Sequence, residues 1–255
     1  MNIVRIYGGL GNQFFQYALG KLQEYHGIRV KYDVAFLKEG VRPNETHRKY
    51  RLDKFYTNVQ AGHFLRQHIV REQNFNLSSL KKQNCNFWGY WQYPEMYAPI
   101  IPTLKKEFCV REEFYTPEYL ELKEKITNKE SVSIHVRRGD YVTNDGFNVL
   151  PLQYYTKALK YVKGDSFYIF SDDIPWCKEH FKKGTFVQME DYLEFELMKL
   201  CTHNIIANST FSWWAAFLNG NPNKIVVAPK QWRERKEDQE KFIKECNLSK
   251  GWIQL

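Results

Sequence analysis

The sequence has no run of about 20 consecutive apolar residues, the length that a helix needs to cross a membrane. Its first residues, MNIVRIYGGLGNQFF, lack the charged region, unbroken apolar run and small-residue cleavage site of a signal peptide. The five cysteines are scattered and never spaced as CxxC, which argues against a disulfide framework and a zinc site. We therefore expect a cytoplasmic protein whose thiols are free.

Acidic residues are in the minority, since 29 Asp and Glu face 37 Lys and Arg and the formal net charge is +8. This surplus favours anionic partners such as a nucleotide diphosphate, nucleic acid or an anionic lipid surface. The basic residues are spread along the chain, whereas a nucleic-acid-binding protein gathers them on one stripe. We therefore expect no nucleic acid partner, while a peripheral contact with the inner face of the membrane stays open.

Strands and helices alternate along much of the chain, which predicts an α/β fold. The opening predicts a strand at 2–7, a glycine turn at 8–11, a helix at 12–25 and a strand at 28–32. The second half repeats the pattern, and strands are predicted at 132–136, 166–170, 186–188, 204–207 and 224–228. Repeated βα units predict parallel sheets covered by helices on both faces, with ligands at the carboxyl ends of the strands.

The part between these two patterns is less regular, with helical spacing at 63–71 and 117–126. A polar segment at 127–130 then precedes the strand at 132–136. We therefore predict two domains, 1–128 and 129–255, with the last helix, near 239–245, packing back onto the first domain.

The segment SVSIHVRRGDYV, residues 131–142, places two arginines directly after a predicted buried strand. The guanidinium of Arg137 has a fixed fork of donors that fits phosphate oxygens. His135 precedes it by two residues, so strand alternation puts both on one side and sends Arg138 elsewhere, towards Asp140. The alternative is an Arg–Asp pair that only closes a turn.

Two further strands end in polar side chains. Asp172 and Asp173 follow the strand at 166–170, where two carboxylates could bind a divalent metal or accept hydrogen bonds from a guanine. Asp173 could instead cap the helix that begins with the next residues. The third strand end carries hydroxyls and free backbone N–H groups at a helix start, which favours phosphate over simple capping. These residues are Ser209, Thr210, Phe211 and Ser212.

The glycine turn after the first strand allows a second interpretation. Gly9 and Gly11 open a βαβ unit and Asp33 ends the next strand, as in a dinucleotide-binding oxidoreductase. Phe14, however, occupies the third glycine position of that motif, where a bulky ring opposes close packing of helix on strand. The turn therefore presents the amide of Asn12 without a complete dinucleotide motif.

Four motifs together resemble glycosyltransferase family 11, the bacterial type of α-1,2-fucosyltransferase. They are GGLGNQFFQYALG (8–20), HVRRGDYV (135–142), FYIFSDDIPWCK (167–178) and NSTFSWWAAFLN (208–219), in the order of the family. The resemblance implies a GT-B-like arrangement of two Rossmann-like domains with parallel sheets facing across a cleft. It also implies that GDP-fucose is bound mainly by the second domain, that no metal or other cofactor is required, and that the fucose anomeric carbon is inverted.

The resemblance further assigns roles to residues. Arg137 would bind the donor pyrophosphate, and His135 with Asp172 or Asp173 would contact the guanosine, which removes the metal role of the two carboxylates. Residues 209–212 would close on the phosphates. Gly9, Gly11 and Asn12 would face the donor from the first domain.

The catalytic base and the acceptor site are less defined by the motifs. Related α-1,6-fucosyltransferases carry a carboxylate eight residues after the matching arginine, which implies Asp145, although that position also suits a turn residue. Trp91, Gln92 and Tyr93 are predicted to contact the acceptor sugar, and core packing is the alternative for them.

The predicted reaction is transfer of L-fucose from GDP-fucose to the 2-hydroxyl of a terminal galactose, on an oligosaccharide or a lipid-linked glycan of polysaccharide biosynthesis. The alternatives are a fucosyltransferase of another linkage, another GDP-sugar transferase and, remotely, the oxidoreductase.

Overall fold

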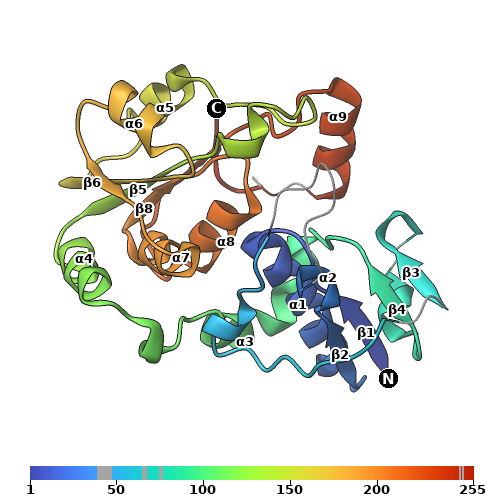
Figure 1. The fold of residues 1–255 in the computed structure, drawn as a ribbon. Helices are drawn as coiled ribbons and strands as arrows, with labels where there is room; N and C mark the ends of the chain where they lie inside the picture. Colours follow the sequence, from blue (N-terminus) through green and yellow to red (C-terminus); the bar gives the residue numbers. More distant parts are fainter. Residues whose placement is uncertain (39–47, 65–67, 75–76, 247, 249) are drawn as a thin grey trace. The chain divides into compact units, whose positions relative to one another are not determined.

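The computed structural model describes residues 1–38, 48–64, 68–74, 77–246, 248 and 250–255. The chain forms two compact units, Met1–Arg111 and Glu112–Leu255 (Figure 1). The division lies before helix α4 (Pro117–Thr127) and not after it at residue 128, because α4 packs on α7 (Asp191–Leu200) of the second unit. The rings of Phe114 and Tyr192, with centroids 6.1 Å apart, add to this contact.

The first unit contains a four-stranded parallel sheet in the order β2-β1-β4-β3. Its strands are β1 (Asn2–Arg5), β2 (Val30–Asp33), β3 (Ile69–Arg71) and β4 (Asn86–Trp88). The helix predicted at 63–71 is wrong at its end, because Ile69 and Val70 are β-branched residues that pair with β4. Residues 65–67 of that prediction lie outside the described residues.

Helix α1 (Leu10–Tyr25) connects β1 to β2 as the sequence predicts, and most of its residues are buried. Phe14 is completely buried between Phe55 and Phe108, with centroids 5.0 and 4.2 Å away. The other helical segments of this unit are short. They are α2 (Ala35–Lys38), α3 (Ile101–Glu107), η1 (Leu52–Lys54), η2 (Glu72–Asn74), η3 (Leu77–Lys81) and η4 (Pro94–Ile100).

The second unit contains a six-stranded parallel sheet in the order β10-β9-β8-β5-β6-β7. The strands are β5 (Ser131–Val136), β6 (Ser166–Ser171), β7 (Thr185–Val187), β8 (His203–Ile205), β9 (Val226–Ala228) and β10 (Ile253–Gln254). The remaining helical segments are η5 (Glu112–Phe114), η6 (Gly139–Tyr141), α5 (Leu152–Ala158), α6 (Ile174–His180), α8 (Thr210–Leu218) and α9 (Lys236–Glu245). Figure 1 shows α5 and α6 on one face of the sheet and α7 and α8 on the other. The predicted α/β class with parallel sheets is confirmed.

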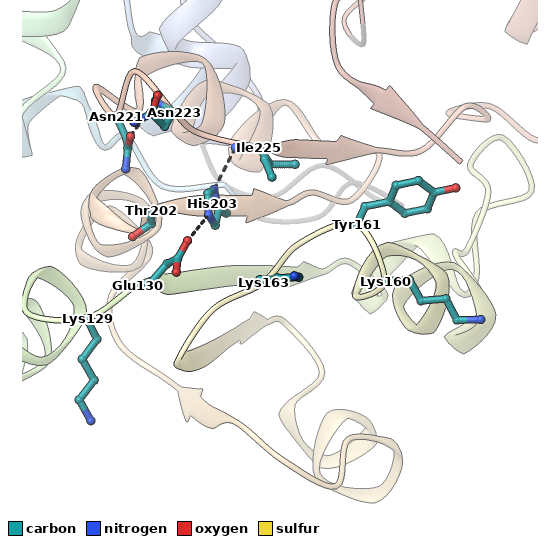
Figure 2. Close-up of a pocket in the computed structure, with 10 residues that line it drawn as sticks. All are labelled: Lys129, Glu130, Lys160, Tyr161, Lys163, Thr202, His203, Asn221, Asn223 and Ile225. Atoms are coloured by element: carbon teal, nitrogen blue, oxygen red, sulfur yellow. Dashed lines mark hydrogen bonds and ion pairs between the residues drawn. The ribbon is translucent and has the colours of Figure 1, made fainter.

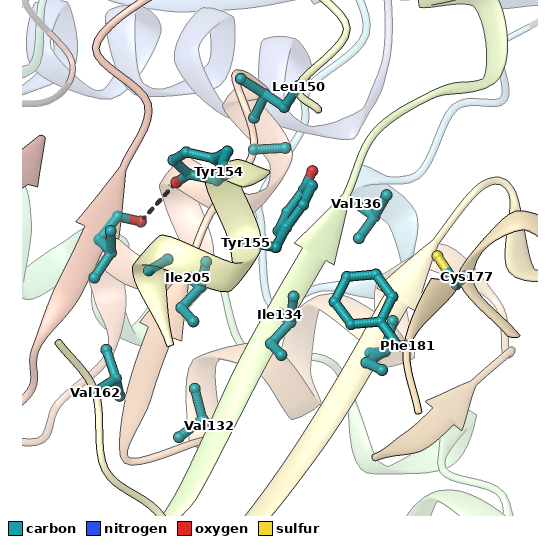
Figure 3. Packing of buried hydrophobic residues seen from close by; sticks show 14 residues of the cluster. Val132, Ile134, Val136, Leu150, Tyr154, Tyr155, Val162, Cys177, Phe181 and Ile205 are labelled. Carbon is teal, nitrogen blue, oxygen red and sulfur yellow. Dashed lines mark hydrogen bonds between the residues drawn. The ribbon is translucent and has the colours of Figure 1, made fainter. Parts of the chain in front are cut away.

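Strand β5 lies in the middle of this sheet, and all six of its residues are buried. Val132, Ile134 and Val136 pack against Tyr154 and Tyr155 of α5 (Figure 3). Each such side chain stabilises the fold by about 1.5–3 kcal/mol when fully buried. The rigid strand therefore fixes the position at which residue 137 leaves the sheet.

Candidate active site

The carboxyl ends of β5 and β6 bring the predicted arginines and aspartates together. The strands pair in parallel, with Val136 opposite Ser171, so the residues that follow each strand meet at one edge. Arg137 and Arg138 follow β5, and Asp172 and Asp173 follow β6. The parallel register thus makes this cluster of opposite charges.

Arg137 is held by two carboxylates. Its Nη2 pairs with Asp140, and its Nη1 lies 2.7 Å from Oδ2 of Asp172. The guanidinium also lies over the Tyr141 ring, 5.0 Å from its centroid. Since only 17% of the side chain is exposed, these contacts fix its direction. Two of its five N–H donors serve the carboxylates.

Gly139 is necessary for this arrangement, because a Cβ at this position would collide with the Asp172 carboxylate. The glycine of the RRGD sequence therefore lets Asp172 reach Arg137. A packing requirement, and not a left-handed backbone, explains this glycine.

Arg138 points to a different partner from the one predicted. Its Nε lies 2.9 Å from Oδ2 of Asp173 and its guanidinium lies 4.3 Å from the centroid of Trp176, so the expected contact with Asp140 is wrong. The hydrogen bond from Arg138 lowers the pKa of Asp173 below its ordinary value. Arg137 and Arg138 therefore pair with different carboxylates, Asp172 and Asp173.

Asp172 and Asp173 have a protein partner for each carboxylate oxygen. The backbone N–H of Arg138 donates to Oδ1 of Asp172 at 2.9 Å, and that of Trp176 donates to Oδ1 of Asp173 at 3.2 Å. Asp173 is therefore the cap of α6, the alternative that the sequence left open. Both carboxylates form ion pairs with the arginines, Asp172 with Arg137 and Asp173 with Arg138.

His135 and Ser212 meet in the interior, with Nδ1 2.8 Å from Oγ. Burial lowers the pKa of His135 to about 3, because an imidazolium would lose its hydration, and the charge of Arg137 lowers it further. The ring is thus neutral at physiological pH. Phe211 lies beside it, with ring centroids 5.5 Å apart.

The hydroxyls at the start of α8 have different tasks. Oγ of Ser209 accepts from the N–H of Phe211 at 3.4 Å and caps the helix. Ser212 turns inward to His135, and Thr210 is the half-buried first residue of the helix. Hydroxyls beside a helix N-terminus are suited to bind an anion, as the sequence predicts.

Asp145 lies in an exposed turn in which the N–H of Gly146 donates to Oδ1 of Asn144 at 3.0 Å. The turn is anchored by Tyr141 and Phe147, which stack with centroids 4.2 Å apart. The predicted turn is therefore present, and Asp145 sits at its tip on the loop that follows Arg137.

Two residues at this edge were given no role of their own by the sequence reasoning. Asn208 is 3% exposed, and its Nδ2 donates to the carbonyls of Asn148 and Trp232 at 2.7 and 3.0 Å. The hydroxyl of Tyr141 donates to the carbonyl of Asn208 at 3.2 Å. Asn208 therefore joins three loops, and its place at the head of the run Asn208–Ser–Thr was the available signal.

Glu194 was also missed, because on α7 it reads as an ordinary solvated helix residue. Burial raises its pKa to about 7, and Asp191, Asp172 and Glu190 raise it further, against a lowering hydrogen bond from the N–H of Met189. That bond is 2.9 Å long. Glu194 is thus a titrating group near neutral pH, close enough to Asp172 for their charges to interact.

In the first unit, the polar turn after β1 is held mainly by structural bonds. Gly8 has a φ of +79°, which favours glycine, and Gly9 caps α1, while Gly11 is buried within it. Oδ1 of Asn12 accepts from Nε2 of Gln92 at 3.0 Å. Asp33 is occupied by Arg5, 3.0 Å from its Nε, which does not favour the ribose contact of the oxidoreductase interpretation.

The three predicted acceptor residues lie in different environments. Trp91 is completely buried and packs on Phe87, so its ring has no face towards solvent. Gln92 is 7% exposed and Tyr93 is half-buried. Of the two alternatives given for Trp91, core packing describes its position.

A cavity of about 590 Å³ lies at the amino ends of the second sheet, away from the residues described above (Figure 2). Lys129, Lys160 and Lys163 are among its lining residues, and none of the predicted site residues lines it. His203 is at its base, where Nδ1 accepts from the N–H of Ile225 at 2.9 Å and Nε2 lies 3.1 Å from the Glu130 carboxylate. These bonds tie β8 to the neighbouring strands.

Two kinds of feature are absent from the described residues. No three His, Cys, Asp or Glu side chains gather there as ligands for a metal ion. No helix within the described part is long and apolar enough to cross a membrane.

The comparisons with known proteins identify the family of the chain. The model of glycosyl transferase family 11 matches residues 1–255, and the chain belongs to this family of glycosyltransferases. The resemblance predicted from the four motifs is confirmed.

Two relatives from Escherichia coli are similar over nearly their whole length. The chain is 31% identical to an alpha-1,2-colitosyltransferase over 92% of this chain and 93% of that protein. It is 31% identical to the O-antigen biosynthesis glycosyltransferase WbnK, over 88% and 92%. It is 25% identical to a mouse galactoside 2-alpha-L-fucosyltransferase, Sec1, over 86% of this chain and 65% of that protein.

Among solved structures, the fucosyltransferase NodZ from Bradyrhizobium is similar with a TM-score of 0.51. The match covers 89% of this chain and 94% of NodZ at 14% identity, so it supports the fold alone. The GT-B-like fold class predicted from the sequence is confirmed.

Proposed function

We propose that this chain is an inverting glycosyltransferase that moves L-fucose from GDP-fucose to the 2-hydroxyl of a terminal galactose. Membership of family 11 and the relatives named as galactoside 2-alpha-L-fucosyltransferases support this reaction. One observation carries the proposal: Arg137 is held in place by Asp172 at the carboxyl end of β5. His135, two residues earlier, contacts Ser212 of α8.

In the proposed reaction, the acceptor 2-hydroxyl oxygen forms a bond to the fucose anomeric carbon while the bond to the β-phosphate oxygen breaks. Negative charge grows on the departing GDP, and Arg137 stabilises it. The loss of a comparable preorganised donor costs about 2.7–4 kcal/mol. Asp140 and Asp172 keep the guanidinium in place before the donor arrives.

The hydroxyl proton has to leave as the new bond forms, and we assign it to the carboxylate of Asp145. This residue lies on the exposed loop after Arg137, where an acceptor can reach it. The rest of the second unit is proposed to hold the donor: neutral His135 with Asp172 or Asp173 at the guanosine, and Ser209, Thr210, Phe211 and Ser212 at the phosphates. Gly9, Gly11 and Asn12 of the first unit would face the donor, and that unit would bind the acceptor.

A second donor is favoured by one comparison. The relative that is 31% identical over 92% of this chain is named for colitose transfer. Colitose differs from L-fucose only in lacking the 3-hydroxyl, so the same diphosphate contacts would serve both donors. We therefore give GDP-colitose as the alternative to GDP-fucose.

Metal independence and a membrane contact are further parts of the proposal. Because Arg137 supplies the positive charge for the leaving diphosphate, transfer is expected to persist in excess EDTA, with unchanged initial rate in a radiolabel assay. A rate restored only by Mg²⁺ or Mn²⁺ would contradict this. The charge of +8 favours attachment to anionic vesicles, which would bring the enzyme to lipid-linked acceptors.

Mass spectrometry of transfer products tests the whole proposal. The protein is incubated with lactose and, separately, GDP-fucose, GDP-colitose, GDP-mannose or UDP-galactose. We expect a product one deoxyhexose heavier with GDP-fucose, sensitive to a fucosidase specific for α-1,2 linkages. A product only with a different donor, or one resistant to that fucosidase, would replace the proposed donor or linkage.

A further inference from the structure

The first unit has a turn at residues 90–92, directly after β4, with an unusual backbone. Trp91 has a φ of +60°, in the left-handed region that a bulky side chain rarely adopts. Such a conformation persists only when neighbouring groups hold it, and it is often found at functional sites. The neighbours of this turn therefore indicate what it is for.

Four hydrogen bonds hold the turn. The carboxylate of Glu72 accepts from the N–H groups of Tyr90 and Trp91, at 2.7 and 2.8 Å. The carbonyl of Trp91 accepts from the hydroxyl of Tyr97 at 2.7 Å and from the N–H of Tyr93 at 2.9 Å. Bonds to a carboxylate are stronger than neutral ones, so Glu72 is the main restraint.

Gly89 allows Glu72 to come this close. A Cβ on Gly89 would lie 2.6 Å from Cβ of Glu72 and 3.0 Å from Cε2 of Trp91, both shorter than normal contacts. The carbonyl of Gly89 is in turn fixed by Nε2 of Gln16, at 3.2 Å. Gly89 therefore permits the close contact between Glu72 and the turn.

The strained backbone separates two neighbouring rings. Trp91 is completely buried, whereas Tyr90 is 40% exposed. Tyr7, at the end of β1, supports the Tyr90 ring with centroids 4.9 Å apart. The next residue, Gln92, extends its amide to Oδ1 of Asn12 at 3.0 Å. An exposed aromatic ring and a pair of side-chain amides therefore lie together at the carboxyl edge of the first sheet.

This combination matches the chemistry of a galactose residue. The C–H bonds at carbons 3, 4 and 5 of galactose form an apolar face that stacks on an aromatic ring, while the hydroxyls bind to amides. We propose that Tyr90 is the platform on which the terminal β-galactoside of the acceptor stacks, with the Asn12–Gln92 amide pair contacting its hydroxyls. The proposal rests on the proposed function for its choice of sugar, and it places the stacking ring at Tyr90, where the sequence favoured Trp91.

In this proposal Trp91 is a positioning residue for the Tyr90 ring. Its burial anchors the turn, and its φ of +60° turns Tyr90 outwards. A surface tyrosine elsewhere in the unit provides a matched control, because Tyr25 is 62% exposed at the end of α1 and packs on His26.

Titration calorimetry with lactose, in the presence of excess GDP, tests the platform. We expect Tyr90→Ala to weaken lactose binding about tenfold, from the loss of one stacking contact. Tyr90→Phe keeps the ring and Tyr25→Ala leaves the platform intact, so both should bind lactose as the wild type does. Melting curves check that each variant is folded.

Release of GDP from GDP-fucose without an acceptor separates this inference from the proposed function. Tyr90→Ala should release GDP at the wild-type rate, whereas Arg137→Ala should not. A wild type that consumes no GDP-fucose contradicts the proposed function alone, since lactose binding still decides the platform. Equal lactose affinity in Tyr90→Ala and wild type, or no lactose binding by the wild type, would overturn the platform.

Discussion

The two units present different chemistry at the same place in similar sheets. At the carboxyl edge of the second sheet, two arginines and three carboxylates pair with one another. At the carboxyl edge of the first sheet, tyrosine rings and neutral amides lie next to a single Arg5–Asp33 ion pair and to the Glu72 carboxylate, which bonds to backbone N–H groups. Parallel sheets thus supply the position, and the residues after each strand set its chemistry. Under the two proposals above, the second unit would bind an anionic diphosphate and the first a neutral sugar.

The largest expected effect comes from removing the charge of the second unit. Arg137→Ala should lower the transfer rate by about 10²–10³-fold, because the developing charge on GDP loses its preorganised donor. The measurement is kcat with saturating donor. Lys163→Ala, at the opposite edge of the same sheet, is the control and should transfer normally. Near-normal turnover by a folded Arg137→Ala protein would contradict the proposed role of Arg137 at the leaving diphosphate.

Next in size is the proposed base on the loop after Arg137. Asp145→Asn should lower kcat by about 10²-fold and abolish the acidic limb of the pH–rate profile, since the amide cannot take the proton. Asn144→Ala, in the same turn, controls for damage to the loop. A pH–rate profile identical to that of the wild type would exclude Asp145 as the base.

A buried amide ties loops together in both units, which allows a direct comparison of stability. Gln13 donates to the carbonyls of Gly8 and Lys49 and accepts from the N–H of Arg51, whereas Asn208 makes its two donations to Asn148 and Trp232. We expect Gln13→Ala to lower the free energy of unfolding by about 3 kcal/mol and Asn208→Ala by about 2 kcal/mol. Urea denaturation measures both, and the reverse order would contradict this account.

The smallest effect concerns Glu194 and depends on pH. Burial raises its pKa to about 7 in the folded protein from an ordinary value of 4.5, so the folded state binds the proton more tightly. Stability from this group is complete below pH 4.5 and is lost as the pH rises from there through 7. The full shift would cost about 3 kcal/mol, and we expect about 2 kcal/mol because the side chain is only half-buried and partly screened by solvent. Glu194→Gln should remove this loss, so the variant gains on the wild type between pH 5 and 8. Parallel stability curves for the two proteins over that range would show that Glu194 is not buried as described.

The fold was predictable where strands are long or repeated with helices. The runs at 132–136 and 166–170 match β5 and β6 within a residue, because their apolar residues fill the centre of a sheet. Strands β3 and β10 are three and two residues long, which is too short to show a period. Their existence depends on pairing with distant segments, and a single sequence does not reveal pairing.

The site was predictable to the level of which residues gather, and not of which pairs form. The rule of carboxyl ends placed Arg137, Asp172 and Ser212 on neighbouring strand ends. It did not predict that Arg138 pairs with Asp173 and not with Asp140, because that pairing depends on the register of β5 and β6. Nor did it reveal the left-handed Trp91, since glycine, and not tryptophan, is the usual mark of that backbone.

The pairing of Arg137 with two carboxylates also affects how well the protein without its donor binds inorganic phosphate. A lone phosphate ion that approaches this guanidinium meets the negative charges of Asp140 and Asp172, which already occupy two of its five N–H donors. In the proposed function, a nucleoside diphosphate would gain further contacts at the start of α8 and at His135. We therefore expect Asp140 and Asp172 to weaken the binding of inorganic phosphate more than the binding of the proposed donor.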